Sequence, residues 1–347
     1  MSRAVGIADA LSAWCSERLG TLVKVLRIDR VEGGWSRQLH RVVLCDTEGQ
    51  ELVIALRGEL AVSVIQSDLA REYAILTVVA ASDVPVPDIV GFESIGDVIG
   101  HRFIAMPWVA GTSINPWRRG AADILGDVLT RAGLADAWIE DIARLHALDV
   151  EGLRRSGVDP DLDADRYLVR EVESWVGILR KADRHPGPLV EEACCWLEAN
   201  RPSGGAPAAI VHGDLRIGNM LVDGARVVAF LDWEMAGIGD WRADIGYSLM
   251  PYHAGKLLSP VPPSANLLVH PRRFLDRYAS TTGRSMPDDE LSWFIVLGCV
   301  KMIAILCTGI DSHAAGRTVD PRLAWTSIAI PGLVTDMCGL IEDGLPW

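Results

Sequence analysis

The chain has 347 residues, of which 49% are hydrophobic, and its net charge is −13 at neutral pH. This length and apolar content suit one large or two ordinary domains with a sizeable core. The acidic balance argues against nucleic acid as a partner, because a phosphate backbone requires a basic surface. An acidic surface is compatible with a cationic small molecule, although it does not identify one.

The cysteines and the apolar segments show which further classes of protein can be set aside. Seven cysteines, with an adjacent pair at 194–195 and no Cys-x-x-Cys, argue against a disulfide framework and a zinc site. The first fourteen residues lack the long apolar core of a secretory signal. The most apolar stretch, 294–310, carries Lys301 in mid-run, which favours a buried helix over a membrane span. We therefore predict a cytoplasmic protein without a membrane partner.

Residues 31–42 read VEGGWSRQLHRV, with apolar flanks around Gly33, Gly34 and Ser36. This pattern predicts two strands joined by a loop that covers phosphates. Glycine lets the backbone approach a phosphate closely, and backbone N–H groups or the Ser36 hydroxyl can donate to it. An ordinary turn is the alternative reading, and the two features that follow along the chain favour the phosphate loop.

An arginine and a glutamate come next. Residues 52–56 predict a short strand that ends at Arg57, and apolar residues at helical spacing predict a helix over 67–80. Glu72 lies on that helix and is the natural partner of Arg57, although two unrelated surface charges would give the same letters. The planar guanidinium could bind a carboxylate in a bidentate manner.

The middle of the chain predicts a strand and a long helix. Val-Pro-Val-Pro at 84–87 ends the preceding helix, and the apolar run at 100–107 predicts a strand. An apolar stripe at three- and four-residue spacing predicts a helix over 134–148. His146, near its end, is either a general base or, as we favour, a packed structural histidine.

A hairpin is predicted in the second half. The apolar runs 220–222 and 226–231 flank Asp223-Gly224, a dipeptide that favours a tight turn. Such a hairpin would bring Asp232, at the end of its second strand, back beside Asn219, at the start of its first.

The residues around this hairpin match the needs of phosphoryl transfer. Asp214, which follows a predicted strand at 208–211, is suited to orient an attacking hydroxyl and accept its proton. Asn219 and Asp232 offer the oxygen ligands that Mg²⁺ prefers, and Mg²⁺ would hold the nucleotide phosphates. His212 is predicted to brace the loop. The alternative is that HGD and DWE are ordinary loop acids.

Arg216, two residues after Asp214, is a second catalytic candidate. A cation at this place can neutralise charge on the transferred phosphoryl group. The alternative reading is a solvent-facing arginine.

The motifs HGDLRIGN, LDWE and GDWRADIG, within 210–246, resemble the aminoglycoside phosphotransferase family. They are most similar to the branch related to the kinase domain of acyl-CoA dehydrogenase family members 10 and 11, although Trp241 stands where a proline is usual. The resemblance implies an α+β, two-lobed protein-kinase-like fold. It implies a small β-rich nucleotide-binding lobe at 1–107 and a larger, mostly helical catalytic and substrate-binding lobe at 108–347.

The resemblance also implies further site residues in the first lobe. Arg57 would replace the lysine that contacts nucleotide phosphates in protein kinases. Met106 would flank the adenine. The Pro107 carbonyl and the Val109 N–H would form hydrogen bonds with the edge of the base. Relatives commonly carry glutamate where this chain has Pro107, which lacks a donor but keeps its carbonyl. Trp108 would either stack on the base or fill the hinge.

In the second lobe, the resemblance gives Asp244 the role of fixing the backbone of the catalytic loop. Glu234 would lie either next to the metal ligands or in a loop on the substrate side. Helices predicted at 272–278, 288–307 and 323–341 would wall the acceptor site.

The sequence therefore predicts a Mg²⁺-dependent enzyme that moves the γ-phosphoryl group of ATP or GTP to a hydroxyl of a small molecule. The acceptor would be aminoglycoside-like, macrolide-like or hydroxyacyl-CoA-like. A non-catalytic nucleotide-binding regulatory protein is one alternative, but Asp214, Asn219 and Asp232 are all intact. A protein kinase is another, but the chain lacks a recognisable activation segment that ends in Ala-Pro-Glu.

Overall fold

A computed structural model describes residues 2–31, 36–60, 67–116, 126–159, 162–202, 206–254 and 268–347. The loop glycines Gly33 and Gly34 lie outside the described residues. The chain divides into two compact units. Unit 1 comprises Met1–Ser82 and Val86–Ala110, and unit 2 comprises Asp83–Pro85 and Gly111–Trp347.

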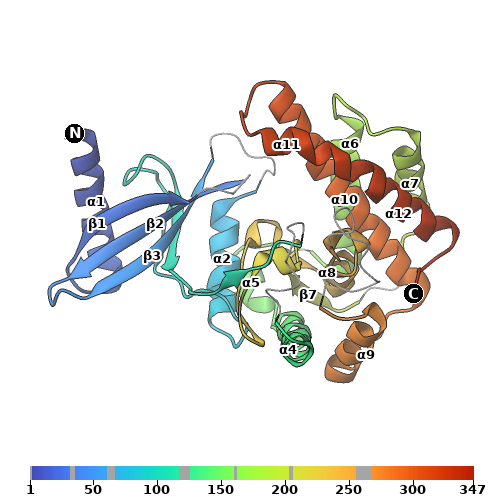
Figure 1. The fold of residues 1–347 in the computed structure, drawn as a ribbon, viewed down its shortest axis with the longest axis horizontal. Coiled ribbons are helices and arrows are strands. Elements are labelled where there is room, and N and C mark those ends of the chain that lie inside the picture. Colours follow the sequence, from blue (N-terminus) through green and yellow to red (C-terminus); the bar gives the residue numbers. More distant parts are fainter. Residues whose placement is uncertain are drawn as a thin grey trace. The chain divides into compact units, whose positions relative to one another are not determined.

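Unit 1 is built on an antiparallel sheet (Figure 1). Its strand order is β1-β2-β3-β5-β4. The strands are β1 (Val23–Val31), β2 (Arg37–Asp46), β3 (Glu51–Glu59), β4 (Gly91–Glu93) and β5 (Phe103–Pro107). The strands predicted at 52–56 and 100–107 correspond to β3 and β5.

Two helices complete the described part of unit 1. Helix α1 (Ser2–Leu19) lies beside β1 and packs an apolar face onto the sheet, with the Trp14 ring 5.0 Å from that of Phe103. Helix α2 (Leu69–Ala80) is the helix predicted at 67–80. It begins at Leu69 because Asp68 caps it, accepting a hydrogen bond from the Ala70 N–H.

Unit 2 is mostly helical. Its helices are α4 (Val128–Ala147), α5 (Glu151–Arg155), α6 (Ala164–Arg180), α7 (Pro188–Ala199), α8 (Trp241–Ser248), α9 (Pro271–Thr282), α10 (Asp288–Ala314), α11 (Pro321–Trp325) and α12 (Ile330–Glu342). Short 3-10 turns are η1 (Ile217–Asn219), η2 (Trp233–Met235), η3 (Pro251–Ala254) and η4 (Thr326–Ala329). This small β-rich unit and large helical unit confirm the predicted α+β class.

Two small sheets carry the loops of interest in unit 2. Strands β6 (Thr112–Ser113), β8 (Met220–Asp223) and β9 (Arg226–Phe230) form one, in the order β6-β8-β9. Strands β7 (Ala208–Val211) and β10 (Gly237–Asp240) pair antiparallel in the other. Residues 212–219, which include η1, therefore connect β7 to the β8–β9 hairpin.

Helix α10 is the core helix of unit 2, packed against α6, α8 and α12 (Figure 1). By length and composition alone, α10 and the stretch Pro321–Glu342 are apolar enough to cross a membrane. The apolar window of α10 is, however, 83% buried inside the protein. This burial confirms the sequence prediction of a buried helix around Lys301.

Candidate functional site

The β8–β9 hairpin has the predicted form. Met220 pairs with Phe230, and Gly224 at the turn has φ +57°, in the left-handed region that glycine adopts freely. Leu231, one residue past β9, donates its N–H to the carbonyl of Asn219 at 2.7 Å. The hairpin thereby brings Asp232 back to Asn219.

Asp214 is held by two side chains from its own loop. One carboxylate oxygen accepts from Arg216 Nε at 3.0 Å, and the other accepts from Asn219 Nδ2 at 2.5 Å. Burial, the largest single effect, raises the pKa of this carboxyl, but the Arg216 guanidinium, the Tyr247 hydroxyl and the neighbouring histidines together lower it more. The pKa therefore lies below its ordinary value, and Asp214 is a carboxylate at neutral pH.

Asp244 fixes the backbone that leads to Asp214. Its carboxylate accepts the N–H groups of His212 and Gly213 at 2.7 and 2.8 Å and contacts His146 Nε2 at 3.2 Å. The other ring nitrogen of His146 lies 2.9 Å from the Tyr278 hydroxyl. Burial raises the pKa of Asp244, but the hydrogen bond from His146 and further contacts lower it more. His146 is thus a buried residue that holds Asp244 in place, which agrees with the packed structural histidine favoured from the sequence.

His212 connects the loop to the hairpin. Its Nδ1 accepts the N–H of Asp214 at 3.2 Å, so Nε2 carries the proton and donates to the Leu231 carbonyl at 2.9 Å. Burial lowers the pKa of this ring, which keeps it neutral. Gly213 between them has φ +81°, and a Cβ there would lie 2.4 Å from the Met235 carbonyl oxygen. Only glycine fits this position.

Asn219 and Asp232 suit a magnesium ion. The Asn219 Nδ2 also donates to the Asp214 main-chain oxygen at 3.0 Å. Its Oδ1, on the opposite side of the amide group, could therefore serve as a metal ligand. Asp232 has φ 71° and ψ 54°, a left-handed conformation that is uncommon outside glycine and often marks a functional site. Glu234 follows in η2.

Within the described ranges, no cluster of three or more His, Cys, Asp or Glu side chains could hold a metal. Mg²⁺ usually takes only one or two protein carboxylates and completes its shell with phosphates and water. A pair of oxygen ligands at the hairpin therefore fits this ion.

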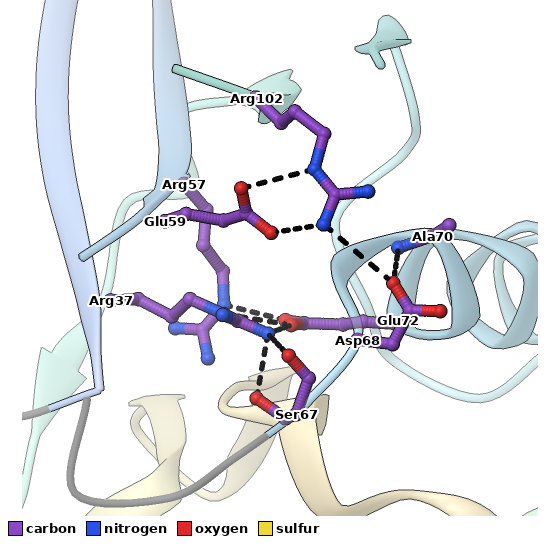
Figure 2. Close-up of polar contacts among 8 residues, drawn as sticks. All are labelled: Arg37, Arg57, Glu59, Ser67, Asp68, Ala70, Glu72 and Arg102. Carbon is purple, nitrogen blue, oxygen red and sulfur yellow. Dashed lines mark hydrogen bonds and ion pairs between the residues drawn. The ribbon is translucent and has the colours of Figure 1, made fainter. Parts of the chain in front are cut away.

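The predicted pair of unit 1 is present, and a second arginine joins it (Figure 2). Arg57 Nε lies 2.5 Å from one Glu72 oxygen, while Arg37 Nε and Nη2 lie 3.2 and 3.1 Å from the other. Arg37 Nη2 also donates to Ser67 Oγ at 2.7 Å. Two guanidinium groups thus share one carboxylate.

The sequence analysis missed Arg37. Leu39 pairs with Arg57 across β2 and β3, so Arg37, two residues back, lies on the same face as Arg57. Arg37 directly follows Ser36, which is buried at the end of the predicted phosphate loop. The position of Arg37 next to that loop could have marked it as a candidate for phosphate binding. Only the register of β2 and β3 shows that Arg37 and Arg57 lie on the same face of the sheet.

The remaining candidates of unit 1 lie on or after β5. Met106 is buried, and Pro107 pairs with Ile54 of β3. Trp108 donates its N–H to the Val53 carbonyl at 2.9 Å, and Val109 follows it. The Trp108 ring is partly exposed and faces the Arg41 guanidinium at 5.7 Å.

Two further polar groups, also missed, lie near Asp214. Tyr247 lies in the last turn of α8 and His253 lies in η3, with ring centroids 4.7 Å apart. The buried Tyr247 hydroxyl faces the Asp214 carboxylate, and burial together with that carboxylate raises the pKa of Tyr247. The buried His253 Nε2 makes no hydrogen bond within the described part of the chain. Burial, followed by Arg216, lowers the pKa of His253 to about 3, so the ring is neutral. Buried polar groups rarely lack partners, and nothing in the local sequence pattern singled these two out.

The model of the phosphotransferase enzyme family matches residues 28–270. Acyl-CoA dehydrogenase family member 10 of Mus musculus is 26% identical over 259 residues, which cover 71% of this chain and 22% of that protein. The match to a family member 11, from Gallus gallus, covers 30% of that relative. The chain therefore corresponds to less than a third of the length of either relative.

Solved structures show the same fold. A Ralstonia eutropha protein assigned to the aminoglycoside phosphotransferases superposes with a TM-score of 0.78 at 20% identity, over 97% of this chain and 98% of that chain. The GDP complex of aminoglycoside 2'-phosphotransferase-IIIa gives a TM-score of 0.61 at 14% identity, over 95% and 98% of the two chains. These likenesses confirm the protein-kinase-like fold predicted from the sequence.

Proposed function

We propose that this chain, which belongs to the phosphotransferase enzyme family, is a small-molecule kinase that uses Mg²⁺ and ATP or GTP to phosphorylate a hydroxyl group. The observation that supports this proposal is the arrangement of an ionised Asp214 held between Arg216 and Asn219, with Asp232 returned to Asn219 by the hairpin. This is the set of groups that phosphoryl transfer requires.

Unit 2 would supply the catalytic groups. Asp214 orients the acceptor hydroxyl and takes its proton late, because the transition state is loose. Arg216, held against Asp214, stabilises negative charge on the transferred group. Asn219 and Asp232 would hold Mg²⁺, which neutralises charge on the nucleotide phosphates. His212 and Asp244 keep the loop in place.

Unit 1 would bind the nucleotide. Arg57, oriented by Glu72, contacts the phosphates, and Arg37 adds a second positive charge beside the predicted loop of Gly33, Gly34 and Ser36. Met106, Pro107 and Val109 would take the base. The GDP bound by a structural neighbour supports a nucleotide as co-substrate and leaves both ATP and GTP as donors.

The acceptor would meet Tyr247 and His253. Both present a buried polar atom near the catalytic carboxylate, and His253 Nε2 has no hydrogen-bond partner in the described residues. A hydroxylated acceptor would satisfy them, since each group can donate or accept. Aminoglycoside-like, macrolide-like and hydroxyacyl-CoA-like alcohols are the candidates, the last because of the acyl-CoA dehydrogenase relatives. We place the reaction in the cytoplasm.

The test is a phosphorylation assay with Mg²⁺, ATP or GTP, and a panel of aminoglycosides, macrolides, hydroxyacyl-CoAs and amino alcohols. Mass spectrometry would detect the gain of one phosphoryl group. Asp214→Asn should abolish the product and keep nucleotide binding. Asp223→Asn is the matched control, because it removes an exposed carboxylate from the same hairpin and keeps a favourable turn residue.

A product that persists in Asp214→Asn would remove Asp214 from its role. Nucleotide binding that is independent of Mg²⁺, together with no product from any acceptor, would favour a regulatory binding protein. Phosphate transfer to a generic protein substrate would instead indicate a protein kinase.

A further inference from the structure

The core helix α10 contains one buried cation. Lys301 lies near its middle among apolar residues and is only 6% exposed. Burying an ammonium group is costly unless it is paired or hydrogen-bonded. An uncharged methionine would fill a similar space without that cost. The polar partners of Lys301 should therefore explain why a lysine stands at this position.

The shortest contact of Lys301 is to the catalytic loop. Its Nζ donates to the Gly213 carbonyl oxygen at 2.6 Å, whereas the nearest carboxylate oxygen, on Glu171, is 3.9 Å away. The rings of Trp175 and Tyr247 flank the ammonium at 5.2 and 5.3 Å from their centroids. The two rings and Glu171 compensate the buried charge, and the hydrogen bond points it at Gly213.

The bonded carbonyl belongs to the peptide group between Gly213 and Asp214. Lys301 holds the oxygen of this peptide, and His212 Nδ1 accepts its N–H at 3.2 Å. The preceding N–H, of Gly213 itself, is held by Asp244. The peptide group that carries the catalytic aspartate is therefore fixed at both ends by side chains.

This peptide needs such restraint because Gly213 is a glycine. The close approach of the Met235 backbone and the φ of +81° exclude any larger residue. Glycine, however, gives little intrinsic resistance to rotation of the peptide that follows it. A hydrogen bond to the peptide oxygen supplies that resistance and sets the direction in which the Asp214 side chain leaves the backbone.

We infer that Lys301 is a positioning residue that orients Asp214 by locking the Gly213–Asp214 peptide from the core helix. This inference rests on the proposed role of Asp214. A purely structural ion pair with Glu171 would place the ammonium closer to the carboxylate than to the carbonyl, and the distances show the reverse.

The test compares three variants. Lys301→Met removes the donor, Lys301→Arg keeps a cationic donor, and Glu171→Gln removes the nearby carboxylate while leaving the bond to Gly213. The first readout is Mg²⁺-dependent hydrolysis of ATP or GTP by water, measured as kcat and nucleotide KM. The second is hydrogen exchange of the 212–216 amides and, separately, of α10.

We expect Lys301→Met to lose about 30-fold in kcat, roughly 2 kcal/mol, with nucleotide KM changed less than about 3-fold. Its 212–216 amides should exchange faster while those of α10 keep their protection. Lys301→Arg should recover most of the lost kcat, and Glu171→Gln should stay within about 3-fold of the wild type. If Lys301→Met does not fold, Lys301→Gln, which keeps a neutral donor, is measured in the same way.

A Lys301→Met enzyme with unchanged kcat, or with faster exchange along α10 rather than the loop, would overturn the inference. If the wild type hydrolyses neither nucleotide and phosphorylates no acceptor of the panel, the proposed function fails, and the exchange pattern alone decides whether Lys301 locks the loop. The two failures are thus distinguishable.

Discussion

Replacing Glu72 with Gln should destabilise the region where α2 meets β3, because it removes the carboxylate that the guanidinium groups of Arg37 and Arg57 share (Figure 2). The Arg37, Arg57 and Glu72 side chains are 4%, 16% and 1% exposed. At contacts of 3.1 and 2.5 Å and an effective dielectric of about 20, each pair gains about 5–7 kcal/mol before desolvation is subtracted. Breaking a buried pair from one side typically costs about 3–5 kcal/mol, and we expect a loss in that range.

The assay is hydrogen exchange, which gives the free energy of opening for individual amides of α2 and β3. Glu51→Gln, at the exposed start of β3, is the matched control and should change it by less than about 0.5 kcal/mol. Adding Arg37→Met to Glu72→Gln should cost less than the sum of the two single changes, because it removes one of the two cations that shared the lost carboxylate. Two results would refute the idea of a shared carboxylate. One is a loss of less than about 1 kcal/mol in the free energy of opening of Glu72→Gln, and the other is a double variant whose loss equals the sum of the two single losses.

Three other predictions concern unit 2. Gly213→Ala should lower Tm by several degrees and lose most turnover, since its Cβ would meet the Met235 carbonyl, whereas Gly224→Asn, at an open position with φ +57°, should behave like the wild type. His253 has its pKa lowered from 6.5 to about 3, so protonation favours the unfolded chain. Its contribution to stability is therefore complete above about pH 6.5 and falls by roughly 1.4 kcal/mol per unit as the pH drops towards 3. Urea unfolding of His253→Gln should show a shallower pH slope, and an unchanged slope would contradict the assignment. Asp232→Ala should remove the Mg²⁺ dependence of nucleotide affinity in calorimetric titrations, and a retained dependence would place the metal elsewhere.

The sequence by itself determined those features that depend on near neighbours along the chain. Asp223-Gly224 between two apolar runs predicted the hairpin, and with it the return of Asp232 to Asn219. The 3.6-residue spacing on 67–80 predicted the helix that carries Glu72, and the pair with Arg57 followed. Turn chemistry and periodicity act over a few residues, so they can be read without the fold.

Only the tertiary structure decided which distant side chains join these motifs. Arg37 meets Glu72 because the β2–β3 register puts it on the face of Arg57. Lys301 lies 88 residues from Gly213 in sequence and reaches its carbonyl only because α10 packs against α6 and α8 in the core of unit 2. Neither contact can be predicted from the residues nearby in sequence. A buried charge is stable only with partners, and here packing supplies those partners from distant parts of the chain.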